Sequence, residues 1–428
     1  MRYKTYKIIT SALSGPIGLW LRFRRLRGRE SEKRFAERFG HSNIPRPKGT
    51  LLWIHAASVG EANSVLPLID VLQARFRDIN ILITTGTLTS AKLMEKRNLK
   101  NVLHQFVPVD TPEATNRFLR HWRPDIGFWV ESELWPNLVI NARARGCFMI
   151  IVNGRMSVKS YDKWQKFGLL MIYQMLNCFE VVFAQNEADA QRFRGLGAQD
   201  VRCLGNLKHD ALPLSCNEAD LFSLQQAIGL RPMWLAASTH AGEEEILARA
   251  HTLLTKTHPD LLTVIVPRHP IRGAEIAKQL SGYGKVGLRS NGDKVTAATN
   301  IYIADTLGEL GLFYRLSEIV FMGGSLIEHG GQNPLEPARL RCCIITGPNT
   351  NNFAEIYNEM EKLSICFRAK NADELAATID KLMGNSDLLT SAQVRGKEWL
   401  RGKTGASARI VNAIAPIFTI KNDTAERS

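Results

Sequence analysis

The sequence lacks the short motifs that would identify several enzyme classes at once. It contains no Walker sequence G-x-x-x-x-G-K-[ST], and no G-x-G-x-x-G fingerprint opens its first half. The second absence disfavours a nicotinamide-dependent enzyme. No Asp-x-Asp pair is available to hold a divalent metal. Without such a metal, a leaving phosphate would have to be stabilised by backbone dipoles and basic side chains.

Cysteines are few, and their spacing does not pair them. The 428 residues include seven, an odd number, and no two form a C-x-x-C pair. Four lie in or beside apolar runs, namely Cys147, Cys342, Cys343 and Cys366. This pattern predicts reduced, packed thiols in a cytosolic compartment rather than disulfides or a zinc site.

The N-terminal apolar stretch is too short for a clear transmembrane helix. Residues 8–21, "IITSALSGPIGLWL", are 14 uncharged residues that would extend roughly 21 Å as a helix, against about 30 Å for a hydrocarbon core. A basic cluster follows at once: Arg22, Arg24, Arg25, Arg27, Arg29, Lys33 and Arg34. This favours an interfacial anchor on anionic lipid with the body on the cytoplasmic side, over a signal peptide or a single span. A packed N-terminal helix with a solvated basic face is the alternative.

The bulk composition is that of a basic globular protein. Hydrophobic residues make up 45% and charged residues 22%, and the net charge is +14. Such a surface suits an anionic partner: nucleic acid, anionic lipid or a phosphorylated substrate. Nucleic acid is disfavoured because the most basic run, residues 22–34, has one aromatic, Phe23, and adjoins an apolar stretch.

Apolar, β-branched runs alternate with helical patterns along the chain. The first series is "TLLWIHAAS", "NILITTG", "DIGFWVESE", "CFMIIVNGR" and "EVVFAQN", and after a pause the second is "MWLAAST", "LLTVIVPRHP", "NIYIADT", "EIVFMGGS" and "RCCIITG". Such repetition predicts an α/β protein with two doubly wound parallel sheets. We expect an anchor over residues 1–30, a Rossmann-like domain over 31–210 and another over 211–428, whose last helices could pack back on the first. Two such domains facing each other would leave a ligand cleft at the carboxyl ends of their strands.

Acidic side chains follow two strands of the first predicted domain. Glu61 stands with Ser58 and Gly60 at the turn after "LLWIHAAS". It is either a first-turn acid that complements the helix dipole or a general base aimed into the cleft. Glu131 and Glu133, in "VESELWPN", would point the same way in an extended segment.

A basic, polar segment follows the next strand. It contains Arg155 and Lys159 beside Asn153, Ser157 and Ser160. Because cations and hydroxyls bind anionic groups, this segment suits a phosphorylated or acidic ligand.

Four strands of the second predicted domain end in residues that suit a phosphate or nucleotide. The strand-end residues are Ser238, Thr239, His240, Arg268, His269, Gly308, Glu309, Leu310, Gly323, Gly324 and Ser325. Small residues and hydroxyls at helix entries let backbone N–H groups approach a phosphate, and arginine adds charge. Together these ends predict a nucleotide pocket.

The order of these motifs resembles a known family. The segments are "IHAASVGEANSVLPLI", "ESELWPNLV", "NGRMSVKSY", "GNLKHD", "ASTHAGEEE", "VPRHPIR", "DTLGELGLFY", "GGSLIEHGGQNPLEPA" and "TGPNTNNF", from residue 54 to about 353. They are similar to the two-domain GT-B glycosyltransferases, and more narrowly to the 3-deoxy-D-manno-octulosonic acid (Kdo) transferases of Gram-negative bacteria. Another GT-B glycosyltransferase or a sugar-nucleotide epimerase of the same fold is the alternative.

The resemblance implies a lipopolysaccharide-synthesis reaction without a cofactor. Kdo would pass from CMP-Kdo to a tetraacylated lipid A precursor, lipid IVA, at the cytoplasmic face of the inner membrane. The reaction would invert the anomeric centre and need no metal. Glu61 would be the general base, and Glu131 a second acid near the acceptor. Anionic lipids, not nucleic acid, would be the further partner.

The resemblance also implies a donor site in the second domain. Ser238, Thr239 and Arg268 would lie near the phosphate or cytidine, and Gly308 and Leu310 would flank the base. Backbone and hydroxyl donors to the phosphate would come from Gly323, Gly324 and Ser325. Asn333 would lie at a helix start, and Glu336 would bind the ribose hydroxyls. Glu328 would order the loop or face the donor sugar.

Overall fold

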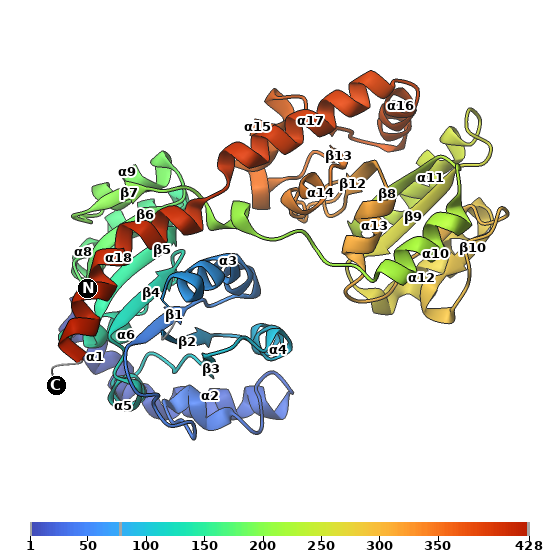
Figure 1. Cartoon of the computed structure of the whole chain (residues 1–428). Coiled ribbons are helices and arrows are strands. Elements are labelled where there is room, and N and C mark those ends of the chain that lie inside the picture. Colours follow the sequence, from blue (N-terminus) through green and yellow to red (C-terminus); the bar gives the residue numbers. More distant parts are fainter. Residues whose placement is uncertain (1, 77–78, 426–428) are drawn as a thin grey trace. The chain divides into compact units, whose positions relative to one another are not determined.

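The computed structural model describes residues 2–76 and 79–425 and divides the chain into two compact units. The first contains Met1–Ala211 and Lys403–Ser428, and the second contains Leu212–Gly402 (Figure 1). The C-terminal helix therefore belongs to the first unit. Each unit is an α/β domain built on one parallel sheet.

The first unit is built on a seven-stranded sheet. Its strands are β1 (Leu51–His55), β2 (Asn80–Thr85), β3 (Val102–Phe106), β4 (Ile126–Val130), β5 (Phe148–Gly154), β6 (Phe179–Ala184) and β7 (Val201–Cys203). They pair in the order β3-β2-β1-β4-β5-β6-β7, all parallel. The order reverses between β1 and β4, which is the place where open α/β sheets bind ligands.

Helices cover both faces of this sheet (Figure 1). They are α1 (Tyr3–Ala12), α2 (Ser14–Leu26), α3 (Val59–Arg75), α4 (Leu88–Arg97), α5 (Pro112–Trp122), α6 (Pro136–Ala144), α7 (Val158–Lys163), α8 (Leu169–Leu176), α9 (Glu187–Gly195) and α18 (Ala406–Ala425). Successive residues of β1 enter different cores: Trp53 packs in the one with α5 and α6, and Ile54 in the one with α3 and α18. Both cores are predominantly apolar, which explains the continuous hydrophobic runs in the sequence.

The second unit repeats the plan. Its strands are β8 (Met233–Thr239), β9 (Leu262–Pro267), β10 (Val286–Leu288), β11 (Ile301–Ile303), β12 (Ile319–Met322), β13 (Cys343–Thr346) and β14 (Cys366–Arg368), in the parallel order β10-β11-β9-β8-β12-β13-β14. Its helices are α10 (Glu218–Ile228), α11 (Glu244–Leu254), α12 (Gly273–Leu280), α13 (Leu310–Leu316), α14 (Leu335–Arg339), α15 (Ala354–Lys362), α16 (Ala372–Met383) and α17 (Ser386–Lys403). Here the order reverses between β8 and β12.

Short helices connect these elements. The 3-10 helices are η1 (Phe35–Phe39), η3 (Leu207–Asp210), η4 (Pro270–Arg272), η5 (Ser281–Tyr283), η6 (Arg289–Asn291) and η7 (Asn351–Phe353), and η2 (Trp164–Gly168) is a π-helical turn between α7 and α8. The prediction of two parallel α/β sheets is confirmed.

The N-terminal apolar stretch forms two helices that break at Leu13. The first helix is docked on its own unit: the Tyr6 hydroxyl donates to Asp110 Oδ2 at 2.9 Å, and Asn137 Nδ2 donates to Thr10 Oγ1 at 3.0 Å. Large apolar side chains nevertheless face outward along both helices: Ile8, Ile9, Leu13, Leu19, Trp20, Phe23 and Leu26. Over the described residues, no helix combines the length and hydrophobicity that a membrane crossing requires.

The seven cysteines are all free thiols. Five are buried, as expected, whereas Cys203 is exposed and Cys216 is partly exposed. Burial raises the pKa of the Cys178 thiol to about 11, so this side chain is protonated and unreactive at neutral pH.

Candidate active site

The first site is built on the two loops that follow β1 and β4. Ser58 is the N-cap of α3, and its Oγ accepts the N–H of Glu61 at 3.3 Å. The Glu61 carboxylate accepts the Ala57 N–H at 2.8 Å and the Ser58 hydroxyl at 2.9 Å. Glu61 is thus held by the start of its own helix, in a geometry related to a capping box. These contacts are compatible with both interpretations of Glu61, a capping acid and a general base.

The electrostatics of Glu61 distinguish it from an ordinary capping acid. The residue is only 8% exposed. The pKa of its carboxyl group is raised to about 7, chiefly by burial and then by Glu131 and Glu133, while the hydrogen bonds from Ala57 and Ser58 oppose the rise. A carboxylate with a pKa near neutrality matches the requirement for a general base.

Glu131 lies at the end of β4 in a left-handed conformation, with φ +59°. Its N–H donates to the Val152 carbonyl at 3.1 Å, and its Oε1 lies 2.6 Å from Lys208 Nζ. The chain turns immediately afterwards, and Glu133 is exposed while Glu131 is buried. The expectation that the two acids share one face of an extended segment is therefore wrong.

Lys208 is the functional candidate that sequence reasoning missed. It comes from η3, within "GNLKHD", and forms an ion pair with Glu131 from a distant part of the chain. The segment was recognised as part of the family pattern, but nothing in its spacing pairs the lysine with this acid.

The polar segment after β5 divides into structural and exposed residues. Asn153 is fully buried, and its Oδ1 accepts the Leu207 N–H at 2.9 Å, so its side chain fixes the start of η3. Ser157 caps α7 through the Ser160 N–H at 3.2 Å. Arg155 and Lys159 are exposed, and their cationic groups are accessible to an anionic ligand.

Gly60 occupies the first turn of α3 with open space beside it. A Cβ built there would have Ser58 Oγ, at 3.9 Å, as its sole neighbour within 4 Å among the described residues. Packing therefore does not require glycine at this position. Glycine here makes the helix less stable than alanine would.

The second site is built on the loops after β8 and β12. Ser238 has φ +59°, and the buried Thr239 donates its hydroxyl to Glu244 Oε1 at 3.1 Å. Gly323 permits the close approach of these loops, because a Cβ there would lie 2.4 Å from the Ser238 carbonyl oxygen. The Ser325 hydroxyl is buried, donates to the Met322 carbonyl at 2.5 Å and accepts the Gly347 N–H at 2.7 Å.

The backbone donors of this glycine-rich loop are already occupied. Glu243, fully buried, accepts the N–H groups of Gly324 at 2.6 Å, Ser325 at 3.0 Å and Leu326 at 3.0 Å. The sequence assigned the Gly324 and Ser325 donors, with the Ser325 hydroxyl, to a phosphate. In this structure they bind the protein itself.

Positive charge gathers beside this loop. Arg268 follows β9, is exposed, and its N–H donates to the Thr239 carbonyl at 2.9 Å. The rings of His240 and His329 lie 3.8 Å apart, centroid to centroid, and His269 lies 6.1 Å from His240. The pKa of His240 is lowered to about 4, chiefly by burial and then by the neighbouring histidines and Arg268, so its imidazole is neutral at pH 7.

Asn333 and Glu336 begin α14, as predicted. Asn333 Oδ1 accepts the Leu335 N–H at 3.1 Å, and its Nδ2 lies 3.4 Å from Glu336 Oε1. Burial raises the pKa of the Glu336 carboxyl, while Asn333, Arg339 and Arg268 lower it. Glu328 is exposed in the preceding loop.

Gly308 and Leu310 stand at the start of α13. Gly308 has φ +88° and an open flank, and it lines a cavity of about 310 Å³ with Asp220, Glu309 and Leu312. Glu309 is bound by Arg289 through two hydrogen bonds, of 2.6 and 2.5 Å.

The chain is similar to one group of enzymes over nearly its whole length. A family model described as 3-deoxy-D-manno-octulosonic-acid transferase (kdotransferase) matches residues 33–211. A probable mitochondrial 3-deoxy-D-manno-octulosonic acid transferase of Arabidopsis thaliana is 36% identical over 92% of this chain and 91% of its own length. The 3-deoxy-D-manno-octulosonic acid transferase of Haemophilus influenzae is 33% identical over 90% of this chain and 91% of its own length. This chain belongs to the Kdo transferase family. It is therefore a glycosyltransferase.

Solved structures of lower identity show the fold of this Kdo transferase. UDP-GlcNAc 2-epimerase from Neisseria meningitidis superposes with a TM-score of 0.59 at 14% identity, covering 86% of this chain and 100% of that one. A glycosyltransferase from Rickettsia africae superposes with a TM-score of 0.58 at 14% identity, covering 87% of this chain and 99% of that one. Both likenesses concern architecture alone, that of two parallel-sheet α/β domains of the GT-B type.

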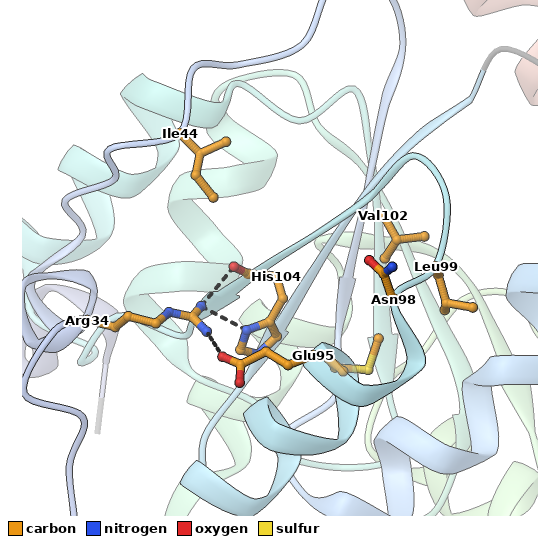
Figure 2. A pocket seen from close by; sticks show the side chains of 8 residues that line it. Arg34, Ile44, Glu95, Asn98, Leu99, Val102 and His104 are labelled. Atoms are coloured by element: carbon orange, nitrogen blue, oxygen red, sulfur yellow. Dashed lines mark hydrogen bonds and ion pairs between the residues drawn. The ribbon is translucent and has the colours of Figure 1, made fainter.

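Another cavity of the Kdo transferase, of about 240 Å³, lies along β3 in the first unit and shares no lining residue with the site around Glu61. Figure 2 shows Arg34 reaching Glu95 and His104 there. Its guanidinium lies 3.2 Å from Glu95 Oε1 and 2.8 Å from the His104 carbonyl, so its charge is used within the protein. Among the described residues, no group of three or more His, Cys, Asp or Glu side chains could hold a metal ion.

Proposed function

We propose that this Kdo transferase transfers Kdo from CMP-Kdo to lipid IVA, a phosphorylated and acylated glucosamine disaccharide. The observation that carries the proposal is Glu61, a buried carboxylate with a pKa of about 7 at the point where the order of the first sheet reverses. The net charge of +14 is consistent with an anionic acceptor.

The chemistry is a single displacement that inverts the anomeric centre. Glu61 takes the proton of the attacking acceptor hydroxyl, and the acceptor oxygen forms a bond to the anomeric carbon of Kdo. The bond from that carbon to the phosphate oxygen breaks, and its electron pair leaves with CMP. Glu131, paired with Lys208 at 2.6 Å, raises the pKa of Glu61 by Coulombic repulsion and so keeps Glu61 basic.

The donor binds in the second unit through side chains more than through the glycine loop. Arg268 supplies positive charge for the phosphate, and Ser238 and Thr239 lie at the adjacent strand end. Glu336, next to Asn333, accepts the ribose hydroxyls. Gly308 and Leu310 flank the base, beside the cavity after β11. No divalent metal takes part.

The protein works at the cytoplasmic face of the inner membrane, bound to anionic lipids. The support is the exposed apolar surface of α1 and α2, where Leu26 is 83% exposed and Trp20 55%, interleaved with exposed Arg22, Arg27 and Arg29. A second apolar surface, over α7 to α8, exposes Phe167 and Leu170 beside lysines. The Tyr3 N–H donates to Gln174 Oε1 at 3.3 Å and connects α1 to α8.

The test is a reconstituted reaction with CMP-Kdo and lipid IVA, in which the mass of the lipid product is measured. A product heavier by one or more Kdo residues is expected, with and without EDTA, and the mass counts the sugars added. The Glu61→Gln variant should form no such product. A wild-type enzyme that leaves lipid IVA unmodified would refute the acceptor assignment, and loss of transfer in EDTA would refute metal independence.

A further inference from the structure

Glu243 is a buried acid that the reaction scheme does not use. It precedes α11 and is 0% exposed. Oε1 accepts the N–H groups of Ser325 and Leu326, and Oε2 accepts those of His240 and Gly324, at 2.6 to 3.0 Å. An ionised carboxylate has about four lone-pair positions, and here four donors fill them. The side chain therefore joins the ends of β8 and β12 at the point where the sheet order reverses.

The same contacts fix His240. Its N–H is held by Glu243, and its ring lies against the glycine loop: a Cβ at Gly324 would be 3.2 Å from His240 Cδ2. His240 Nε2 lies 3.0 Å from Gln332 Nε2, farther along that loop. The loop is thus held by the carboxylate on its N–H groups and by the imidazole beside Gly324.

We propose that Glu243 is a positioning residue for donor binding, which holds the 323–326 loop and His240 in the arrangement that CMP-Kdo requires. The inference rests on the proposed function, because that function places the donor at this end of the sheet. The loop donors are satisfied by an internal carboxylate, so the loop is already held in this arrangement before the donor binds. A fixed loop reduces the ordering needed when ligand binds.

The carboxylate cannot be replaced by its amide without loss. Glutamine at this position has the same shape but offers one acceptor oxygen and one NH2 group. The oxygen could serve one pair of N–H groups, and the NH2 donors would face the other pair. Glu243→Gln should therefore release one half of the loop while leaving the apolar core of the unit intact.

The experiment measures amide hydrogen exchange, CMP affinity and steady-state kinetics on the full-length protein. In Glu243→Gln, exchange of one of the two amide pairs, Ser325 with Leu326 or Gly324 with His240, should rise at least about tenfold, while β8 and β12 stay protected. CMP binding by calorimetry should weaken about tenfold or more. The KM for CMP-Kdo should rise while kcat changes by less than about threefold. This pattern is expected when a variant loses an interaction that stabilises the ground state and the transition state equally.

Leu247→Val is the matched control, because Leu247 is buried in the apolar core on the same helix and its side chain has no group that could hydrogen-bond the loop. It should lower the melting temperature without changing loop exchange or CMP affinity. If Glu243→Gln does not fold, Glu243→Asp keeps the charge with a shorter reach and should show the same changes in weaker form. Unchanged loop exchange or unchanged CMP affinity in a folded Glu243 variant would overturn the proposal. A wild-type protein that binds no CMP would overturn the donor assignment, and with it this role, whatever the exchange data show.

Discussion

Replacing Glu61 with glutamine should abolish transfer and stabilise the fold. The pKa of this carboxyl rises from 4.5 to about 7 in the folded protein, so ionising it there costs about 3 kcal/mol more than in the unfolded chain. Since glutamine has the shape of the protonated acid and no charge, it avoids this cost. We expect Glu61→Gln to raise the free energy of unfolding by about 1–3 kcal/mol at pH 8.

The size of this stabilisation depends on pH in a defined way. Because the folded pKa is above the unfolded one, the stabilisation from protonated Glu61 is complete below pH 4.5 and is lost as pH rises through about 7. The variant and the wild type should therefore be equally stable near pH 4.5, and the difference should reach its maximum above pH 7. Wild-type kcat/KM should fall on the acid side of pH 7, with about a tenth of the base ionised at pH 6.

The assay combines urea unfolding between pH 5 and 8 with the pH dependence of Kdo transfer. Glu113→Gln is the matched control, because Glu113 is an exposed first-turn acid of α5. It should leave transfer unchanged and lower stability slightly, by about 0.3–1 kcal/mol, through the helix dipole. If Glu61→Gln behaved like this control, losing stability and keeping activity, Glu61 would be a capping acid and the proposed base would be wrong.

Three further predictions address other parts of the chain. Gly60→Ala should keep or raise the melting temperature, because the added Cβ has open space beside it. The same variant should reduce kcat/KM, because we assign this space to the acceptor, and an unchanged kcat/KM would contradict that assignment. Arg268→Ala should weaken CMP binding by about ten- to a hundredfold in calorimetry, and unaltered affinity would contradict its role. Leu19→Ser with Leu26→Ser should reduce binding to vesicles containing anionic lipid about tenfold or more in flotation; equal flotation would exclude α2 as the contact.

The strands that could be predicted from the sequence are those covered on both faces. All ten apolar runs are strands, and they occupy the central positions of the two sheets. The four strands that were not recognised, β3, β7, β10 and β14, are the four sheet edges. Each is partly exposed, and three have only three residues. An edge strand has one neighbour and less apolar cover, so its sequence shows no continuous hydrophobic run.

The positions of the site residues could also be predicted, but not their partners. Parallel strands present their carboxyl ends at one edge, and Glu131, after β4, lies close enough to Glu61, after β1, to raise the pKa of Glu61. The pairing of Glu131 with Lys208 depends on how η3 packs beneath β5, through Asn153. No local pattern encodes such a contact.

The two buried glutamates show why position alone does not assign a role. Glu61 and Glu243 each lie after the first strand of a sheet, at the beginning of the next helix. Burial raises the pKa of both. Glu61, however, accepts two hydrogen bonds, which leaves lone pairs that can take a substrate proton. Glu243 accepts four backbone N–H groups, and protonation would break part of that set. The number of donors on each carboxylate therefore supports the two proposed roles, a general base for Glu61 and a positioning residue for Glu243.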